Sequence, residues 1–136
     1  MNDSVVKQFS GRLASANSAP EESDGAEDYG AFAILRGVRD FARFLQLRMK
    51  DGSMIAIGYA WLERVEFQPP SITLHFTTQR VTIIGRNLNS EIRPNVRLLD
   101  GLLRHRVPWL QQADAATVME ADHRATVIES VEVVSI

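Results

Sequence analysis

Two runs of alternating apolar and polar residues, at 45–50 and 55–59, give the clearest structural signal in the chain. The pair Asp51-Gly52 stands between them. Strict alternation is typical of a half-buried strand, and an Asp-Gly pair between two such runs predicts a hairpin with a type I′ turn, in which both central residues have positive φ. A β-hairpin is therefore expected from 45 to 59.

The same alternation returns further along the chain. A short strand is expected at 65–67 and must end at Pro69-Pro70, because proline has no backbone N–H to donate to a sheet. Residues 72–76 and 81–85 then form a second predicted hairpin. The β-branched segment 126–136 predicts a last strand.

Between these strands the period changes to three or four residues. Apolar side chains recur in this way from 88 to 107, which predicts an amphipathic helix that Asn89 or Ser90 caps and Pro108 ends. Pro94 fits only in its first turn. The apolar positions are Leu88, Ile92, Val96, Leu99, Leu103 and Val107.

Residues 29–44 allow two interpretations. An apolar stripe at helical spacing favours a helix, whereas Gly30 and Gly37 favour a strand near 31–35 followed by a turn. The phenylalanines of the chain that fall on apolar stripes are expected in the core, namely Phe32, Phe41, Phe44, Phe67 and Phe76.

This order of elements predicts an α+β fold. We expect an antiparallel sheet of two β-hairpins plus a C-terminal strand, with one amphipathic helix packed on one face, or else a small, partly closed barrel. The chain then divides into a flexible acidic N-terminal arm (1–28), a globular core (29–110), a polar connector (111–125) and the C-terminal strand (126–136).

Composition narrows the class of protein. The chain has 136 residues, of which 45% are hydrophobic and 24% charged, which suits one globular domain. It contains no cysteine, which excludes disulfide scaffolds, thiol nucleophiles and cysteine-ligated metals. No secretory signal and no apolar run of membrane-spanning length is visible, so a cytoplasmic protein is expected. Its net charge of −2 conceals a basic middle, +6 over 29–109, between two ends of −4 each.

Residues 44–110 carry a recurring set of segments: FLQLRMKDG (44–52), GYAWLERV (58–65), the proline pair at 69–70, VTIIGRNL (81–88) and LLRHRVPWL (102–110). In these segments the chain resembles a group of small uncharacterised bacterial proteins. Gly58 departs from the pattern, since such proteins often have proline before the tyrosine. The resemblance covers about half of the chain. It implies one compact domain from roughly 30 to 110 and no activity, because none is assigned to that group.

No catalytic or metal-binding motif emerges from the spacing of reactive residues. The histidines, His75, His105 and His123, are far apart, so no metal and no other cofactor is expected. A small enzyme that uses Glu63, Glu66 and His75 is kept as a third hypothesis, because paired carboxylates act as acid and base where burial separates their pKa values.

The basic middle of the chain is rich in arginine. Arg36, Arg39 and Arg43 share one face if their segment is helical, and Arg86 follows a strand end where a helix N-terminus can accept an anion. These residues predict, as the alternative function, a nucleic-acid-binding domain whose arginine-rich face is masked by the acidic ends. The candidate contact residues are Arg36, Arg39, Arg43, Arg86, Arg104 and Arg106.

The last strand supplies the preferred hypothesis. A β-branched strand that follows a polar connector either completes its own sheet or pairs with the edge of another molecule. We therefore expect a non-enzymatic module that associates with itself, as a homo-oligomer, or with another protein, and that has no membrane partner. The candidate association residues are Val127, Val131 and Val133.

Overall fold

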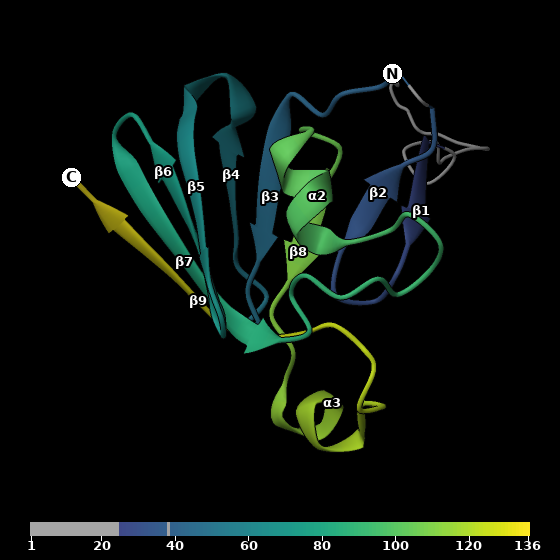
Figure 1. Cartoon of the computed structure of the whole chain (residues 1–136). Helices are drawn as coiled ribbons and strands as arrows, with labels where there is room; N and C mark the ends of the chain where they lie inside the picture. The colour runs from purple at the N-terminus through teal and green to yellow at the C-terminus, as the bar shows by residue number, and fades with distance from the viewer. Residues whose placement is uncertain (1–24, 38) are drawn as a thin grey trace, which may run out of the picture.

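Strands dominate the described part of the chain, which comprises residues 25–37 and 39–136 of the computed structural model (Figure 1). In chain order the elements are β1 (Ala26–Asp28), β2 (Ala33–Leu35), β3 (Phe44–Arg48), β4 (Met54–Gly58), the 3-10 turn η1 (Tyr59–Trp61), β5 (Leu62–Gln68), β6 (Ser71–Phe76), β7 (Gln79–Arg86), α2 (Leu98–Leu103), β8 (Trp109–Gln111), α3 (Ala115–Glu120) and β9 (Val127–Ser135). The strands form three sheets, with the orders β1-β2, β4-β3-β8 and β5-β6-β7-β9.

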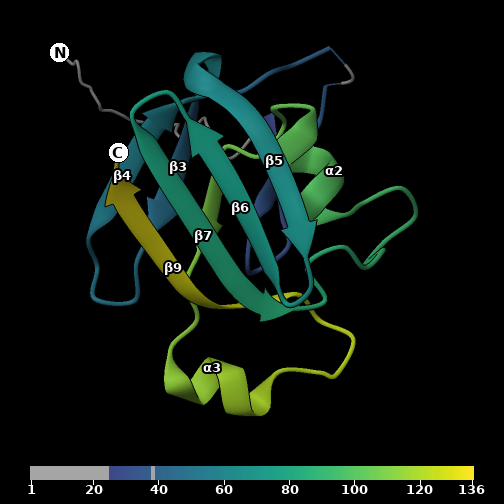
Figure 2. The same ribbon diagram turned by 60° about the vertical axis from the view of Figure 1, so that its left-hand side comes forward.

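The core lies between the two larger sheets and α2. Figure 2 shows the four-stranded sheet face on, with β3 and β4 behind it and α3 standing apart below. Alternate residues of each strand point inward, as the pleat of a strand requires. The buried cluster joins both sheets and α2 through Leu45, Leu47, Ile57, Ile72, Leu74, Phe76, Val81, Ile83, Leu98, Leu102, Leu110 and Ile128.

The predicted α+β class is confirmed. The two expected hairpins are β3–β4 and β6–β7, and β9 pairs antiparallel with β7 of the same chain. The strands belong to separate sheets rather than to one, and β8 pairs parallel with β3. Across the described residues these sheets do not close into a barrel.

The helix predicted over 88–107 is wrong for most of its length. α2 is six residues long, and the segment before it is irregular. Asn87, Asn95 and His105 have φ values of 57°, 66° and 58°, a left-handed conformation that a right-handed helix does not accommodate. No helix in the described part of the chain has the length and apolar character needed to cross a membrane.

Two local predictions also change. The turn after β3 is not type I′, because Gly52 has a φ of 93° but Asp51 does not have a positive φ. Instead the Gly52 N–H donates to the Met49 carbonyl at 3.1 Å, and the left-handed glycine returns the chain to β4. The described residues of 29–44 contain β2 and no helix.

The prediction that all five of these phenylalanines lie in the core is wrong for two of them. Phe41 is 68% exposed and Phe44 is 54% exposed. Phe44 begins β3, where the next residue, Leu45, points to the core, so the alternation turns Phe44 outward. The other three, Phe32, Phe67 and Phe76, contact the core.

The boundaries of the parts also differ from the expected ones. β1 lies inside the range assigned to the N-terminal arm and pairs with β2, with Glu27 opposite Ile34. The rest of that arm, residues 1–24, lies outside the described residues. The range assigned to the polar connector contains the end of β8 and the whole of α3.

Gly85 marks the closest approach of β7 and β9, where the register of the pair shifts between Ile84 and Gly85. A Cβ atom at Gly85 would lie 2.0 Å from the backbone oxygen of Val127. Since a backbone atom cannot move aside cheaply, the two strands must separate to admit a methyl group.

We therefore expect Gly85→Ala to lower the free energy of unfolding by about 1–3 kcal/mol, measured by chemical denaturation. Gly25→Ala is the matched control, because a Cβ atom there would meet nothing within 4 Å. Equal stability of the two variants would contradict this account of the β7–β9 contact.

Candidate binding face

The outer side of the β4-β3-β8 sheet, opposite the core, is unusually apolar for an exposed surface. Cross-strand partners point to the same side of a sheet, so the register assigns its residues: Phe44 pairs with Gly58, Gln46 with Ala56 and Trp109, and Arg48 with Met54 and Gln111. We call this surface, together with Trp61, the aromatic face. Its residues are Phe44, Gln46, Arg48, Met54, Ala56, Gly58, Trp61, Trp109 and Gln111.

One end of the aromatic face is built from Phe44, Gly58 and Trp61. A Cβ atom at Gly58 would lie 3.1 Å from Cδ1 and 3.3 Å from Nε1 of Trp61, and 3.9 Å from Cε1 of Phe44. The indole therefore lies against the glycine, beside the phenylalanine ring. Trp61 is nevertheless 61% exposed, so both aromatic side chains are open to solvent.

In the middle of the aromatic face, Arg48 contacts the side chains of Gln46 and Trp109. Its Cζ atom lies 4.4 Å from the centre of a Trp109 ring, within the range of a cation–π contact. Its Nε and Nη2 atoms both donate to Oε1 of Gln46, at 3.3 and 3.1 Å. These contacts fix the orientation of the Trp109 and Gln46 side chains on two adjacent strands.

The position of Trp61 depends on the corner that η1 makes between the two large sheets. The Tyr59 hydroxyl, at the start of this corner, is buried and donates to the Val107 carbonyl at 2.7 Å. The Tyr59 ring stacks on His105, with ring centres 4.6 Å apart, and the Tyr59 N–H donates to the Arg43 carbonyl. Burial raises the pKa of Tyr59 far above its ordinary value, so the phenol remains a donor.

The charge pattern separates this face from the outer side of the other sheet. The strand positions that form the aromatic face carry no carboxylate. On β5-β6-β7-β9 the outward positions carry both signs of charge and only two moderately exposed apolar side chains, Ile84 and Val134. That sheet resembles an ordinary solvated surface, whereas the aromatic face does not.

The structure brings together two of the three residues of the enzyme hypothesis. His75 Nε2–H donates to Oε1 of Glu66 at 2.9 Å, and Nη2 of Arg64 donates to Oε2 of Glu66 at 2.5 Å. Glu63 lies apart from them and accepts from the Thr77 hydroxyl. The Glu66 and His75 side chains are 35% and 28% exposed on the solvent side of the sheet, which supplies little burial to tune a catalytic pair.

Five of the six candidate arginines lie on two neighbouring segments, 36–43 and 104–106, which are joined by hydrogen bonds from the Leu35 N–H to the Arg106 carbonyl and from the Ala42 N–H to the His105 carbonyl, and Arg86 lies apart from them at the end of β7. Arg104 pairs with Asp100 on α2, and Arg106 donates to the carbonyls of Leu35, Gly37 and Asp40. Of the other four, Arg36 pairs with Glu27 and Arg86 with Glu129, whereas the side chains of Arg39 and Arg43 are exposed without a hydrogen bond or ion pair to any described residue.

The three candidate residues of the last strand face their own molecule. Val127, Val131 and Val133 lie opposite Arg86, Ile83 and Val81 on β7. Val127 is buried and the two others are partly buried against the core. The outer edge of β9 has no partner strand among the described residues.

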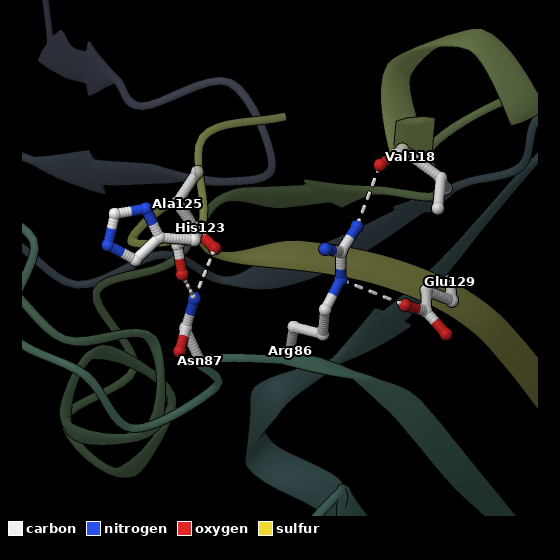
Figure 3. Close-up of polar contacts among 6 residues, drawn as sticks. All are labelled: Arg86, Asn87, Val118, His123, Ala125 and Glu129. Atoms are coloured by element: carbon white, nitrogen blue, oxygen red, sulfur yellow. Dashed lines mark hydrogen bonds and ion pairs between the residues drawn. The ribbon is translucent and has the colours of Figure 1, made fainter. Parts of the chain in front are cut away.

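Residues 112–126, which contain α3 and connect β8 to β9, form a lobe that is hydrogen-bonded to the end of β7 (Figure 3). Nη2 of Arg86 donates to the Val118 carbonyl at 2.8 Å and Nε to Glu129, while Nδ2 of Asn87 donates to the carbonyls of His123 and Ala125. Arg86 therefore joins this lobe to the sheet, and its guanidinium is already bonded within the molecule instead of being open to an anion.

A cavity of about 470 Å³ lies between this lobe, the turn after β3 and the start of β9. Two of its polar side chains are bonded within the molecule: the side-chain oxygen of Gln112 accepts from the Lys50 N–H, and Asp114 accepts from the Thr117 N–H at 2.8 Å. That last bond holds the pKa of the Asp114 carboxyl below its ordinary value.

Sequence reasoning missed the aromatic face, although one signal for it was present. Phe44 is in phase with Gln46 and Arg48, not with Leu45, so the alternation already assigned it to the outer side. No signal assigned Trp61, whose position depends on the corner at η1. Within the described ranges, no three His, Asp or Glu side chains converge in a way that would hold a metal ion.

The contact between Glu66 and His75 predicts a pH effect. The hydrogen bond from His75, supported by the positive charge of Arg64, lowers the pKa of Glu66 below its ordinary value. A lowered pKa stabilises the fold at neutral pH, and this contribution is lost as the pH falls through the folded-state pKa. We expect His75→Ala to raise the pKa of Glu66 in an acid titration followed by NMR.

Asp51 is the internal control for this titration. Its pKa is also lowered, but by hydrogen bonds from the hydroxyl and N–H of Ser53, so it stays unchanged when His75 is replaced. An unchanged Glu66 pKa in the variant would show that His75 is not the main cause of the shift.

The site that the structure offers is therefore a surface, organised by Arg48 and by the corner at η1, rather than a cleft with reactive groups. Comparison with protein-family models, with curated proteins and with solved structures finds no match to this chain.

Proposed function

We propose that this protein is a non-enzymatic binding module that associates with another protein through the aromatic face. The observation that carries the proposal is the joint exposure of Phe44, Met54 and Trp61, at 54%, 52% and 61%, on one side of one sheet. Exposed apolar residues that lie together mark interaction surfaces, whereas scattered ones need no explanation.

The composition of the face supports a protein partner. Interface cores are enriched in aromatic residues, methionine and arginine and depleted in lysine, aspartate, glutamate, serine and alanine. The aromatic face has Phe44, Trp61, Trp109, Met54 and Arg48, and of the depleted types it has only Ala56. Binding energy in such surfaces is concentrated in a few Trp, Tyr and Arg side chains.

The nucleic-acid alternative has weaker support. Four of the six candidate arginines donate to carboxylates or carbonyls of the molecule itself, as described above. Neutralising the phosphates of a strand needs several unoccupied cations in a row. Arg39 and Arg43 alone do not supply such a row.

The hypothesis of self-association also has weaker support at this surface. In a two-fold dimer the same patch meets itself, so a face that carries Arg48 and no carboxylate places like charges on both sides of the interface. A different protein, with its own carboxylates, resolves this mismatch.

The test selects binders of the purified protein from a display library of random peptides and measures the affinity of the selected peptides. We expect the double variant Phe44→Ser/Trp61→Ser to bind them at least tenfold more weakly, because truncation of a central aromatic residue costs about 2 kcal/mol or more. Leu103→Ser is the matched control, since Leu103 is 55% exposed but lies on α2.

Three outcomes would contradict the proposal. Selected peptides that bind the double variant as tightly as the natural protein would place the site elsewhere. If the natural protein sediments as a dimer and the double variant sediments as a monomer, the partner is a second copy of this chain. If the library yields no binding peptide and the protein binds single-stranded oligothymidylate, the nucleic-acid alternative is favoured.

A further inference from the structure

We propose that the aromatic face binds a proline-rich segment in the polyproline II conformation, flanked by acidic residues. This inference rests on the proposed protein-binding function and names the chemistry of the partner. Three features of the face carry it: its hydrogen-bonding groups, the spacing of its two tryptophans and its charge.

The face offers donors and almost no acceptors. Within the described part of the chain, the indole N–H groups of Trp61 and Trp109 have no hydrogen-bond partner, and Arg48 uses only part of its five N–H groups. The Gln46 oxygen is taken by Arg48, which leaves the amide of Gln111 as the remaining side-chain acceptor of the face. A well-matched ligand therefore presents acceptors without donors.

Proline provides this combination in a peptide. Its backbone has a carbonyl but no N–H, so a proline-rich segment presents acceptors along its length and leaves no donor unpaired when it docks. Its preformed extended helix also loses little conformational entropy on binding, and it docks on aromatic surfaces in known recognition modes.

The spacing of the aromatic side chains fits the same ligand. Trp61 lies against Gly58 on β4, and Trp109 lies on β8, with β3 between these strands. Gly58 is opposite Phe44, whereas Trp109 is opposite Gln46, two residues further along β3. Two strand spacings of about 9–10 Å across the sheet and two residues of about 7 Å along it separate the two positions by about 12 Å. Four residues of a polyproline II helix rise about 12 Å, so a segment of about five prolines spans both positions and crosses β3 between Phe44 and Gln46.

The glycine at 58 shapes the contact on the β4 side. Because Gly58 has no side chain, Cδ1 and Nε1 of the Trp61 indole lie over the glycine, next to the Phe44 ring. The two aromatic side chains therefore form one apolar surface that a compact pyrrolidine ring can contact.

The positive charge of the face indicates that acidic residues flank the prolines. Arg48 lies on the face, and Arg43 is exposed immediately before Phe44, without an ion pair to a described residue. Glu63, the carboxylate nearest to Trp61 in the sequence, accepts a hydrogen bond from the Thr77 hydroxyl. Acidic residues beside the proline segment would pair with these arginines and speed the encounter.

The test titrates the full chain with a decaproline peptide that ends in two aspartates. The chain has only two tryptophans, both on the aromatic face, and the peptide has none, so tryptophan emission reports on this surface alone. We expect a saturable change in emission. The control peptide has alanine in place of every proline and keeps both aspartates, and we expect no saturable change with it.

Two conservative variants test the donors. Trp61→Phe and Trp109→Phe each keep an aromatic ring and remove one indole N–H. We expect each to weaken decaproline binding about threefold to tenfold, the range for the loss of one hydrogen bond, and the remaining tryptophan still reports. Leu103→Ser is expected to bind like the natural protein.

The remaining outcomes overturn the inference in different ways. Equal binding of the alanine peptide would indicate strand addition along the outer edge of β4, which uses main-chain N–H groups that proline lacks. Unchanged affinity of both tryptophan variants would remove the donor argument. If display-selected peptides without proline bind the aromatic face while decaproline does not, the proline-rich ligand is wrong but the proposed function stands.

Discussion

The hydrogen bond from the buried Tyr59 hydroxyl to the Val107 carbonyl is the constraint on which the arrangement of the two sheets depends. Tyr59 lies where the chain leaves β4 for β5, and Val107 lies just before β8, so one bond ties the corner between the two sheets to the start of the third strand of the β4-β3-β8 sheet. Without the hydroxyl, a buried carbonyl would lose its partner at a cost of about 1–3 kcal/mol. The stacking of His105 on the same ring adds a second contact between these two segments.

The strands could be predicted from the sequence because each carries its own period-2 signal, as Leu45 and Leu47 show on β3. The segment 88–107 could not, because its apolar residues satisfy a helical period while Asn95 and His105 within it, and Asn87 just before it, adopt left-handed conformations. A periodic pattern records which residues are buried and does not record how the backbone between them runs.

The candidate site was harder to predict than the fold because it consists of residues that the core does not use. Phe44 is expected in the core when it is counted with the apolar stripes, although its phase along β3 places it outside. The pairing of β8 with β3, which brings Trp109 beside Gln46, is parallel and has no local sequence signal. Arg36 and Arg106 are candidates for nucleic-acid contact in the sequence, on a face masked by the acidic ends, but a sequence does not reveal the particular carboxylate and carbonyls that they meet.

The parallel pairing of β8 with β3 also affects how the molecule is made. Gln46 and Trp109 lie 63 positions apart, whereas the β3–β4 and β6–β7 hairpins join neighbouring segments. Closing a long loop costs entropy that a short hairpin avoids, so contacts of this separation favour slow assembly. During synthesis, β3 and β4 leave the ribosome before β8 exists. The complete aromatic face is thus a property of the finished chain, and a truncated product that lacks β8 would display Phe44 and Trp61 without Trp109 beside them.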